Sequence, residues 1–257
     1  MNFAKNTTET SEYTALKSFL DDKTSLDDAI DEFTSVPSSA SAEDKLIRAW
    51  DALFLLACQT PTDSPSQEKL VSALIAIRHR DTQLGEIEGK QVTWSQLPLY
   101  GRQVREHWNY DEAKAQEDDE VAQMWNNANA FAARVTTKAE AFDGSDPLDF
   151  SLYAIWALRK ALEDKDDVPA ATVRASAMWI QYAGKELRRQ SKEKRSFEGK
   201  VAKPGSKYAD KEWTGFETDR WRTWGNRFAN ISEVAPSEEV RKVAKQTKRT
   251  FGDLAAC

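Results

Sequence analysis

The sequence has little of what breaks helices, binds metals or crosses membranes. Its 257 residues include only ten glycines, eight prolines, two cysteines and two histidines. Two cysteines cannot build a disulfide framework, and with two histidines they leave too few ligands for a zinc site. No run of 18 apolar residues occurs, and the first residues hold no apolar stretch typical of a signal peptide. We therefore expect a cytoplasmic protein with no membrane partner, no metal and no other cofactor.

What the sequence does contain favours helices. Good helix formers are plentiful, and between residues 117 and 142 apolar residues recur at three- and four-residue steps. We predict an all-α fold, a single helical bundle of about eight to ten helices. Caps and prolines place helices at 26–35, 41–58, 65–79, 97–109, 117–142, 147–162 and 169–195, then one that Thr214 and Glu217 open as a capping box, and a last one from Pro236. Residues 81–93 and 196–213 are predicted loops, the second of them mobile.

Charge divides the chain into an acidic body and a basic end. Between Lys185 and Arg249 there are 18 Lys and Arg against 10 Asp and Glu, whereas residues 1–184 hold 18 against 31. An acidic body suits cationic ligands, and a basic C-terminal third suits phosphates or nucleic acid. We predict three parts: an N-terminal helical extension at 1–40, a helical core domain at 41–195, and a basic loop with helices at 196–257 packed on the core.

Four segments carry a resemblance to a known family. They are, in order, WSQLPLYGRQVREHWN, WNNANAFAARV, LDFSLYAIWALRKALE and AMWIQYAGKEL. In order and spacing they resemble a fungal family of all-helical proteins known as domain of unknown function 3632, over residues 45–195. No catalytic set comes with this family. The resemblance extends to fungal helical proteins that are tRNA-dependent synthases of arginine-containing cyclodipeptides, and it implies that activity here.

Two motifs suggest ligand chemistry but do not fit it. The segment GEIEGK at 85–90 is one residue short of a phosphate loop, and Gln91 replaces the Ser or Thr that would ligate magnesium. The segment DDAID at 27–31 matches the DDxxD pattern of isoprenoid diphosphate enzymes. Too little chain precedes it to build the cavity that such carboxylates need, so we interpret it as a solvated first turn of a helix.

Candidate catalytic side chains lie beside apolar stripes. His107 lies on the shoulder of the buried stripe of the helix predicted at 97–109, which suits a general base; the alternative is a hydrogen-bonded structural imidazole. Glu106 and Asp149 are weaker carboxylate candidates. Asn126 and Asn129 lie next to the stripe of the helix at 117–142, where an amide either closes a buried network or orients a substrate.

Candidate binding residues fall into two groups. Aromatic and polar side chains on the predicted central helices meet either one another or a substrate, and Trp156 is expected to be buried; the group is Trp108, Tyr153, Trp156, Arg159 and Trp179. The second group is a cationic run that would contact tRNA phosphates, unless it is only a solvated helix end: Lys185, Arg188, Arg189, Lys192, Lys194 and Arg195.

Together these features favour an enzyme that takes aminoacyl groups from aminoacyl-tRNA and joins them into an arginine-containing cyclodipeptide, in fungal specialised metabolism. An aminoacyl ester is already activated, so the reaction requires no metal or redox cofactor. It needs a basic surface for tRNA, an acidic or aromatic pocket for the guanidinium, and a general base for the attacking amine. Two alternatives stay open: a non-catalytic helical module that binds a partner protein, and a cofactor-independent cyclase or isomerase acting on a small molecule.

Overall fold

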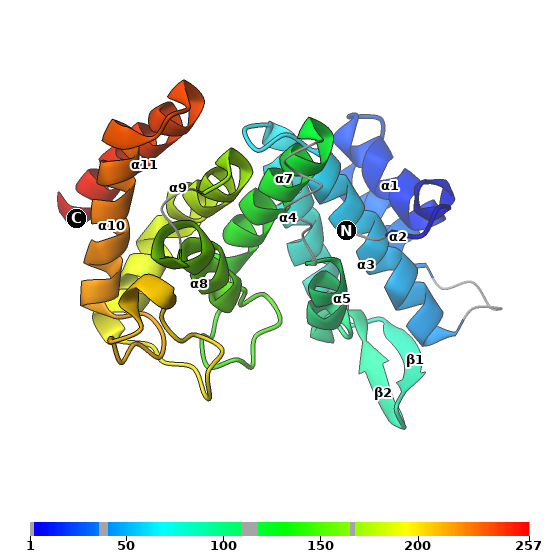
Figure 1. The fold of residues 1–257 in the computed structure, drawn as a ribbon. Helices are drawn as coiled ribbons and strands as arrows, with labels where there is room; N and C mark the ends of the chain where they lie inside the picture. Colours follow the sequence, from blue (N-terminus) through cyan, green and yellow to red (C-terminus); the bar gives the residue numbers. More distant parts are fainter. Residues whose placement is uncertain (1–2, 36–40, 109–117, 165–167, 257) are drawn as a thin grey trace. The chain divides into compact units, whose positions relative to one another are not determined.

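A computed structural model describes residues 3–35, 41–108, 118–164 and 168–256 of the chain (Figure 1). This part of the chain holds ten α-helices and one small two-stranded sheet, which confirms the predicted all-α fold. Contacts between the elements group them into an N-terminal unit, Met1–Asp111, and a C-terminal unit, Glu112–Cys257. This division falls inside the predicted core domain, and in the C-terminal unit the last helix, Glu238–Ala256, packs on the helix Ala170–Glu193.

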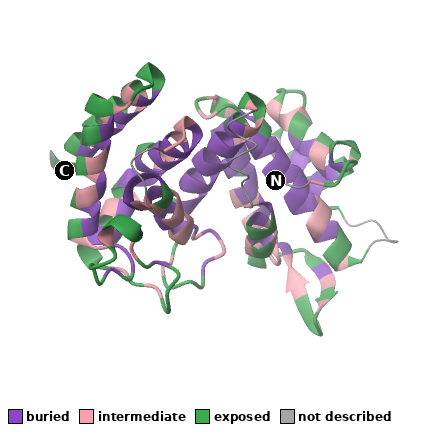
Figure 2. Ribbon diagram, in the orientation of Figure 1, coloured by how far each residue is buried: buried purple, intermediate pink, exposed green. Residues whose placement is uncertain are grey.

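The N-terminal unit is built around α3. Its elements are η1 (Thr7–Glu9), α1 (Ser11–Leu20), α2 (Leu26–Thr34), α3 (Ala42–Gln59), α4 (Pro65–Arg78), β1 (Gln83–Ile87), β2 (Lys90–Thr93), η2 (Trp94–Gln96) and α5 (Tyr100–His107). Three helices start where the sequence predicts, because the hydroxyls of Ser25, Ser41 and Ser64 accept hydrogen bonds from backbone N–H groups of their first turns. Helix α3 is buried almost along its whole length (Figure 2).

A buried ion pair ties α1 to α3. The ammonium group of Lys45 lies 3.0 Å from Oε1 of Glu12, and both side chains are fully buried. Arg48 approaches the same carboxylate oxygen at 3.3 Å from a more exposed position. Burial opposes ionisation of Glu12, but hydrogen bonds and the positive charge of Lys45 outweigh it, so the pKa of Glu12 is lowered. Helix α1 therefore contributes a charged side chain to the core of this unit.

The predicted loop at 81–93 is wrong, because these residues form a β-hairpin. Strands β1 and β2 pair antiparallel, with Ile87 opposite Lys90. The two residues between them, Glu88 and Gly89, both have positive φ, at 50° and 77°. Such a pair is the type I′ turn that matches the twist of a tight hairpin, and glycine adopts it without strain. The segment GEIEGK is thus a hairpin and not a phosphate loop.

The C-terminal unit is built around α9. Its elements are α7 (Asp119–Thr136), α8 (Ser151–Arg159), the π-helical turn η3 (Lys160–Asp164), α9 (Ala170–Glu193), η4 (Ser206–Tyr208), α10 (Thr218–Val234) and α11 (Glu238–Ala256). Helix α9 packs against α7 and α11 (Figure 1). Helix α8 begins later than predicted, since the Asp149 carboxylate accepts a hydrogen bond from the N–H of Ser151.

Residues 196–213, predicted to be a mobile loop, form a loop that hydrogen bonds anchor to the helices. Ser196 pairs with Gly215 in an isolated β-bridge, and Arg220 donates to the carbonyl oxygens of Ala202 and Gly215 at 2.7 and 2.9 Å. The predicted capping box is half present, because Glu217 accepts from the N–H of Thr214 at 3.0 Å while the helix itself begins at Thr218. In the described part of the chain, no helix is long and apolar enough to span a membrane.

Candidate basic cavity and predicted catalytic residues

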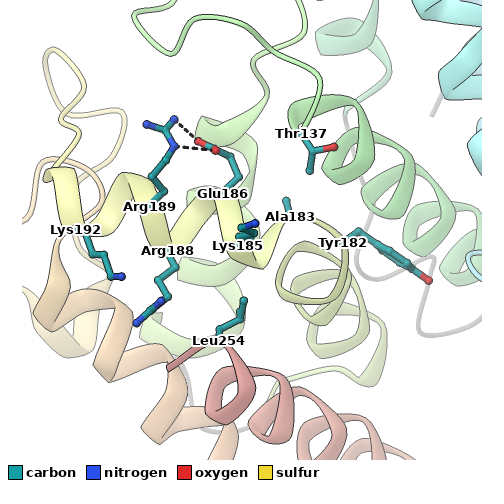
Figure 3. Close-up of a pocket in the computed structure, with 9 residues that line it drawn as sticks. All are labelled: Thr137, Tyr182, Ala183, Lys185, Glu186, Arg188, Arg189, Lys192 and Leu254. Atoms are coloured by element: carbon teal, nitrogen blue, oxygen red, sulfur yellow. Dashed lines mark hydrogen bonds and ion pairs between the residues drawn. The ribbon is translucent and has the colours of Figure 1, made fainter. Parts of the chain in front are cut away.

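A cavity of about 520 Å³ borders the predicted cationic run of α9 (Figure 3). Helix α9 supplies most of its wall, with the C-terminal end of α7 and the last turn of α11 completing it. The lining residues are Thr137, Tyr182, Ala183, Lys185, Glu186, Arg188, Arg189, Lys192 and Leu254. Four of these nine side chains are cations and one is an anion, so the cavity is suited to an anionic ligand.

Helical periodicity explains why the cations share one cavity. Lys185, Arg188 and Lys192 are three and four residues apart, so they lie on one face of α9. Figure 3 shows Arg188 and Lys192 extending from one side of the helix, while Arg189 and Glu186 meet on the other. A glycine at 184 keeps α11 close, since a Cβ there would lie 2.8 Å from the side chain of Leu254.

The cations of the cavity differ in how far they are neutralised. Arg189 bridges Glu186 and Glu193, each at 2.6 Å, and the hydrogen bonds that it donates to Glu186 raise the pKa of the guanidinium. Arg188 donates to the carbonyl oxygen of Ala255 at 3.4 Å, a neutral partner. Lys185 and Lys192 are exposed, and no described carboxylate forms an ion pair with either. The charge available to a ligand is therefore that of Lys185, Arg188 and Lys192.

The remaining two members of the predicted run lie apart from the cavity. Arg195 forms a two-pronged pair with Asp149, with NH2 to Oδ2 at 2.5 Å and NH1 to Oδ1 at 3.3 Å. The side chains are only 12% and 4% exposed, so the pair belongs to the interior of the unit. Lys194 is exposed and ends α9 in a left-handed conformation with φ of 56°. Asp149 and Arg195, predicted for catalysis and for tRNA, thus neutralise each other.

The predicted asparagines lie inside the C-terminal unit. Asn129 donates to the carbonyl oxygen of Trp125 and accepts from the indole N–H of Trp179, both at 2.8 Å. Trp179 is fully buried, so this residue, predicted to bind substrate, is part of the core. Asn126 is also buried, and within the described part of the chain its Oδ1 atom has no hydrogen-bond partner. The periodicity of α7 identified these side chains correctly as lying beside the core, but Asn129 closes a structural network.

Residues of α8 hold the segment that follows α9. Trp156 is half-buried rather than buried as expected, and its indole N–H donates to the carbonyl oxygen of Val201 at 2.9 Å. Arg159 donates to the carbonyl oxygens of Val201 and Lys203. Tyr153 stacks at a tilt on Trp156, with 4.9 Å between ring centroids. These side chains anchor the backbone, which explains why residues 200–203 lie against the helix.

Sequence reasoning missed a buried charged cluster between η3 and α10. Arg220 donates to both carboxylate oxygens of Glu163, at 2.8 and 3.1 Å, and both side chains have no solvent exposure. The same carboxylate accepts from the indole N–H of Trp224 and the backbone N–H of Gly205, at 2.7 and 2.8 Å. All four hydrogen bonds join residues that are far apart in sequence. In the sequence, Glu163 and Arg220 resemble charged residues on the solvated face of a helix, so no local pattern indicates that they are buried together.

His107 lies in the N-terminal unit, where it meets a carboxylate. Its Nε2 atom is 2.6 Å from Oδ1 of Asp51, and Gln103 donates to the same oxygen at 2.7 Å. The imidazole is buried, whereas Glu106 is exposed and Trp108 half-buried. Asp51 was not a predicted site residue. The available signal was that a carboxylate in the middle of the apolar segment at 41–58 requires a buried partner.

The carboxylates of the DDAID segment have ordinary partners. Asp28 accepts from the hydroxyl of Ser25 at 2.7 Å, and Asp31 pairs with Arg80 at 2.8 Å. Within the described ranges, no three His, Cys, Asp or Glu side chains gather closely enough to hold a metal ion. The thiol of Cys58 is buried, and burial raises its pKa, which makes it a poor nucleophile.

Comparison with known proteins gives a family without an activity. The model of a family described as "Protein of unknown function (DUF3632)" matches residues 50–228. No curated protein and no solved structure matches the chain. The match covers both the helix that carries Asp51 and the helix that borders the basic cavity.

Proposed function

The chain belongs to the DUF3632 family of proteins of unknown function, and we propose that it binds the phosphates of an aminoacyl-tRNA in the basic cavity of its C-terminal unit. The observation that carries this proposal is the cavity itself, in which Lys185, Arg188 and Lys192 present charge that no described carboxylate neutralises. RNA binding by proteins depends mainly on such contacts with phosphate groups.

The spacing of the three cations supports a phosphate backbone as the ligand. Lys185 and Lys192 are seven residues apart on α9, which corresponds to about 10 Å along the helix axis. A row of this length can contact consecutive phosphates of one RNA strand. Arg188 lies between them and can present two parallel N–H donors to a phosphate, which a lysine cannot.

The reaction proposed for the bound tRNA is transfer of its aminoacyl group to the amine of a second aminoacyl group. The free amine of the resulting dipeptidyl ester then attacks the remaining ester, which closes an arginine-containing cyclodipeptide, in fungal specialised metabolism, and releases the second tRNA. Support comes from the resemblance of residues 45–195 and from the separation of an acidic body from a basic end. Both esters are already activated, so the chain has to bind and orient the substrates and move one proton in each of the two steps.

A second candidate, a non-catalytic helical module, is favoured by a different observation. Asp149 and Asn129, two of the predicted catalytic residues, are occupied by Arg195 and Trp179. A module that binds a partner requires only its surface, and such internal contacts leave that surface unchanged. A cyclase or isomerase with aromatic walls has less support, because Tyr182 is the only aromatic residue among those lining the cavity.

The test is charge reversal inside the cavity, matched by the same reversal outside it. In the triple variant Lys185→Glu/Arg188→Glu/Lys192→Glu, affinity for arginyl-tRNA at low salt should fall more than roughly tenfold, and the log–log salt dependence should flatten by about two to three units. The control reverses three exposed cations of α11 that do not line the cavity, Lys242, Lys245 and Arg249. This control has the same net charge as the cavity variant, and its affinity for arginyl-tRNA should stay within about threefold of that of the wild type.

Three results separate the alternatives. Equal losses in both triple variants would mean that only net charge matters and that the cavity is not the site. Unchanged binding in the cavity variant would exclude the cavity as the site, and no binding by the wild type would contradict RNA recognition. Binding without cyclodipeptide, measured by mass spectrometry with two aminoacyl-tRNAs present, would favour the non-catalytic module. Arg189 and Arg195 are left unchanged because carboxylates already neutralise their charge.

A further inference from the structure

Asp51 and His107 form a dyad in the core of the N-terminal unit. Asp51 lies in the middle of α3, and His107 is the last residue of α5. The 2.6 Å contact joins Nε2 of the imidazole to Oδ1 of the carboxylate, and Gln103, one turn before His107, donates to the same oxygen. With a proton on Nε2 donated to Asp51, Nδ1 is the free nitrogen of a neutral imidazole and can only accept.

That free nitrogen is unsatisfied. The Nδ1 atom of His107 is buried and has no hydrogen-bond partner among the residues that the structure describes. Buried polar atoms in proteins nearly always have one, so such an exception needs an explanation. An oriented imidazole with a carboxylate behind one nitrogen and nothing at the other has the arrangement of a general base whose proton donor is absent.

The imidazole is covered by one aromatic side chain from the start of the chain. The ring of Phe3 stacks on His107, with 4.2 Å between centroids and 21° between planes. Phe3 itself is half-buried and Ala4, Lys5 and Asn6 are exposed. The first buried residue after them is Thr7, which bonds back to the carbonyl oxygen of Ala4. A segment held mainly by one half-exposed ring can open at little cost in free energy.

We propose that Nδ1 of His107 is the proton-accepting group of a substrate amine, and that Phe3 is a cover that leaves when the amine enters. The amine rests on the function proposed above, where it is the nucleophile of aminoacyl transfer. An amine also suits the surroundings: the ring of Phe54 stacks on the imidazole, the rings of Phe54 and Trp108 lie 6.4 Å apart, and Asp51 supplies negative charge.

The proton balance of the step is simple. The amine nitrogen forms a bond to the ester carbonyl carbon while one of its protons passes to Nδ1 of His107. The ester carbon–oxygen bond then breaks, and the departing ribose oxygen takes up that proton. The imidazole therefore returns to its starting state, and Asp51 stabilises it while it is positively charged. Asp51 and Gln103 act as positioning residues, since neither is proposed to touch the substrate.

The cover can be tested without RNA, because the chain has only two histidines and they differ in exposure. His79 is exposed and serves as the internal reference for acylation by diethyl pyrocarbonate. In the wild-type chain, peptide mass spectrometry should show His107 reacting at least roughly tenfold more slowly than His79, by virtue of burial. Phe3→Ala should bring the two rates within about threefold, whereas Lys5→Ala, in the same segment, should change neither rate. Circular dichroism checks that both variants stay folded.

Two outcomes would overturn the cover: equal rates for both histidines in the wild type, or a His107 rate that Phe3→Ala leaves unchanged. The class of ligand is tested with argininamide, which should protect His107 of Phe3→Ala from acylation but should not protect His79. No protection would contradict an amine as the ligand.

The catalytic role is tested with two variants. His107→Gln should keep tRNA affinity and lose product, and Asp51→Asn should lower kcat more than it raises KM. If wild type binds no RNA, the proposed function fails while the acylation result still decides the cover.

Discussion

The buried pair of Glu163 and Arg220 gives the sharpest test of what holds the C-terminal unit together. Glu163→Gln keeps the shape of the side chain and removes its charge, leaving the guanidinium of Arg220 buried and uncompensated. Both carboxylate oxygens accept from N–H donors, two of them on Trp224 and Gly205, so either orientation of the new amide points its NH2 group at a donor. Breaking a buried ion pair from one side costs about 3–5 kcal/mol, and we expect a loss of that size.

The measurement is urea unfolding of the full chain followed by tryptophan fluorescence, with Arg189→Gln as the control. Arg189 is 45% exposed and also pairs with two glutamates, yet exposed pairs contribute only about 0–1 kcal/mol. Glu163→Gln/Arg220→Met should lose less than the sum of the two single losses, by about 1–3 kcal/mol, because it removes the stranded charge. A loss in Glu163→Gln no larger than that of the control would refute the reasoning. Trypsin should also cut after Lys200 and Lys207 faster in this variant, since the backbone N–H of Gly205 loses its anchor.

Two further predictions concern the N-terminal unit. The folded-state pKa of Glu12 lies below its ordinary value of 4.5. The ionised carboxylate therefore contributes stability above pH 4.5, and this contribution is lost as the pH falls through the lower folded pKa. In urea unfolding, the midpoint of Glu12→Gln should depend less on pH than that of the wild type below about pH 4.5. Burial raises the pKa of the Cys58 thiol, which makes the thiol unreactive. In a Cys257→Ser variant, the native protein should therefore take up no maleimide over hours at pH 7, whereas the urea-unfolded protein should react at one thiol. Rapid labelling of the native protein would show that α3 opens.

Local signals in the sequence predicted the helices well. A serine N-cap depends on a hydrogen bond to a backbone N–H group within the next three residues, so the starts of α2, α3 and α4 could be predicted from the sequence. The hairpin at 83–93 was missed because its turn is Glu88-Gly89, and only the glycine is a common member of such turns. The helix predicted to reach residue 142 ends at Thr136, although apolar residues continue at helical spacing, since periodicity cannot show where backbone hydrogen bonding stops.

The site was harder to predict because its chemistry depends on pairs that are distant in sequence. Asp149 and Arg195 are 46 residues apart and Asp51 and His107 are 56 apart, so no local pattern shows that they meet. In the sequence alone, each of these residues can be interpreted either as a reactive group or as one partner of a structural hydrogen bond or ion pair. Burial was predictable from the position beside an apolar stripe, as for Asn129, but the partner was not. His107 keeps both interpretations, because one nitrogen has a partner and the other has none within the described part of the chain.

The basic run carries less free positive charge in the folded unit than its sequence indicates. From Lys185 to Arg195 the sequence contains six cations and two glutamates, which is a strongly positive segment. In the folded unit, both glutamates pair with Arg189, and Asp149, from outside the run, neutralises Arg195. Lys194 stands at the helix end, away from the residues lining the cavity, which leaves Lys185, Arg188 and Lys192 to act together. A phosphate ligand would therefore contact three side chains on one helical face, and its salt dependence should report about three contacts rather than six.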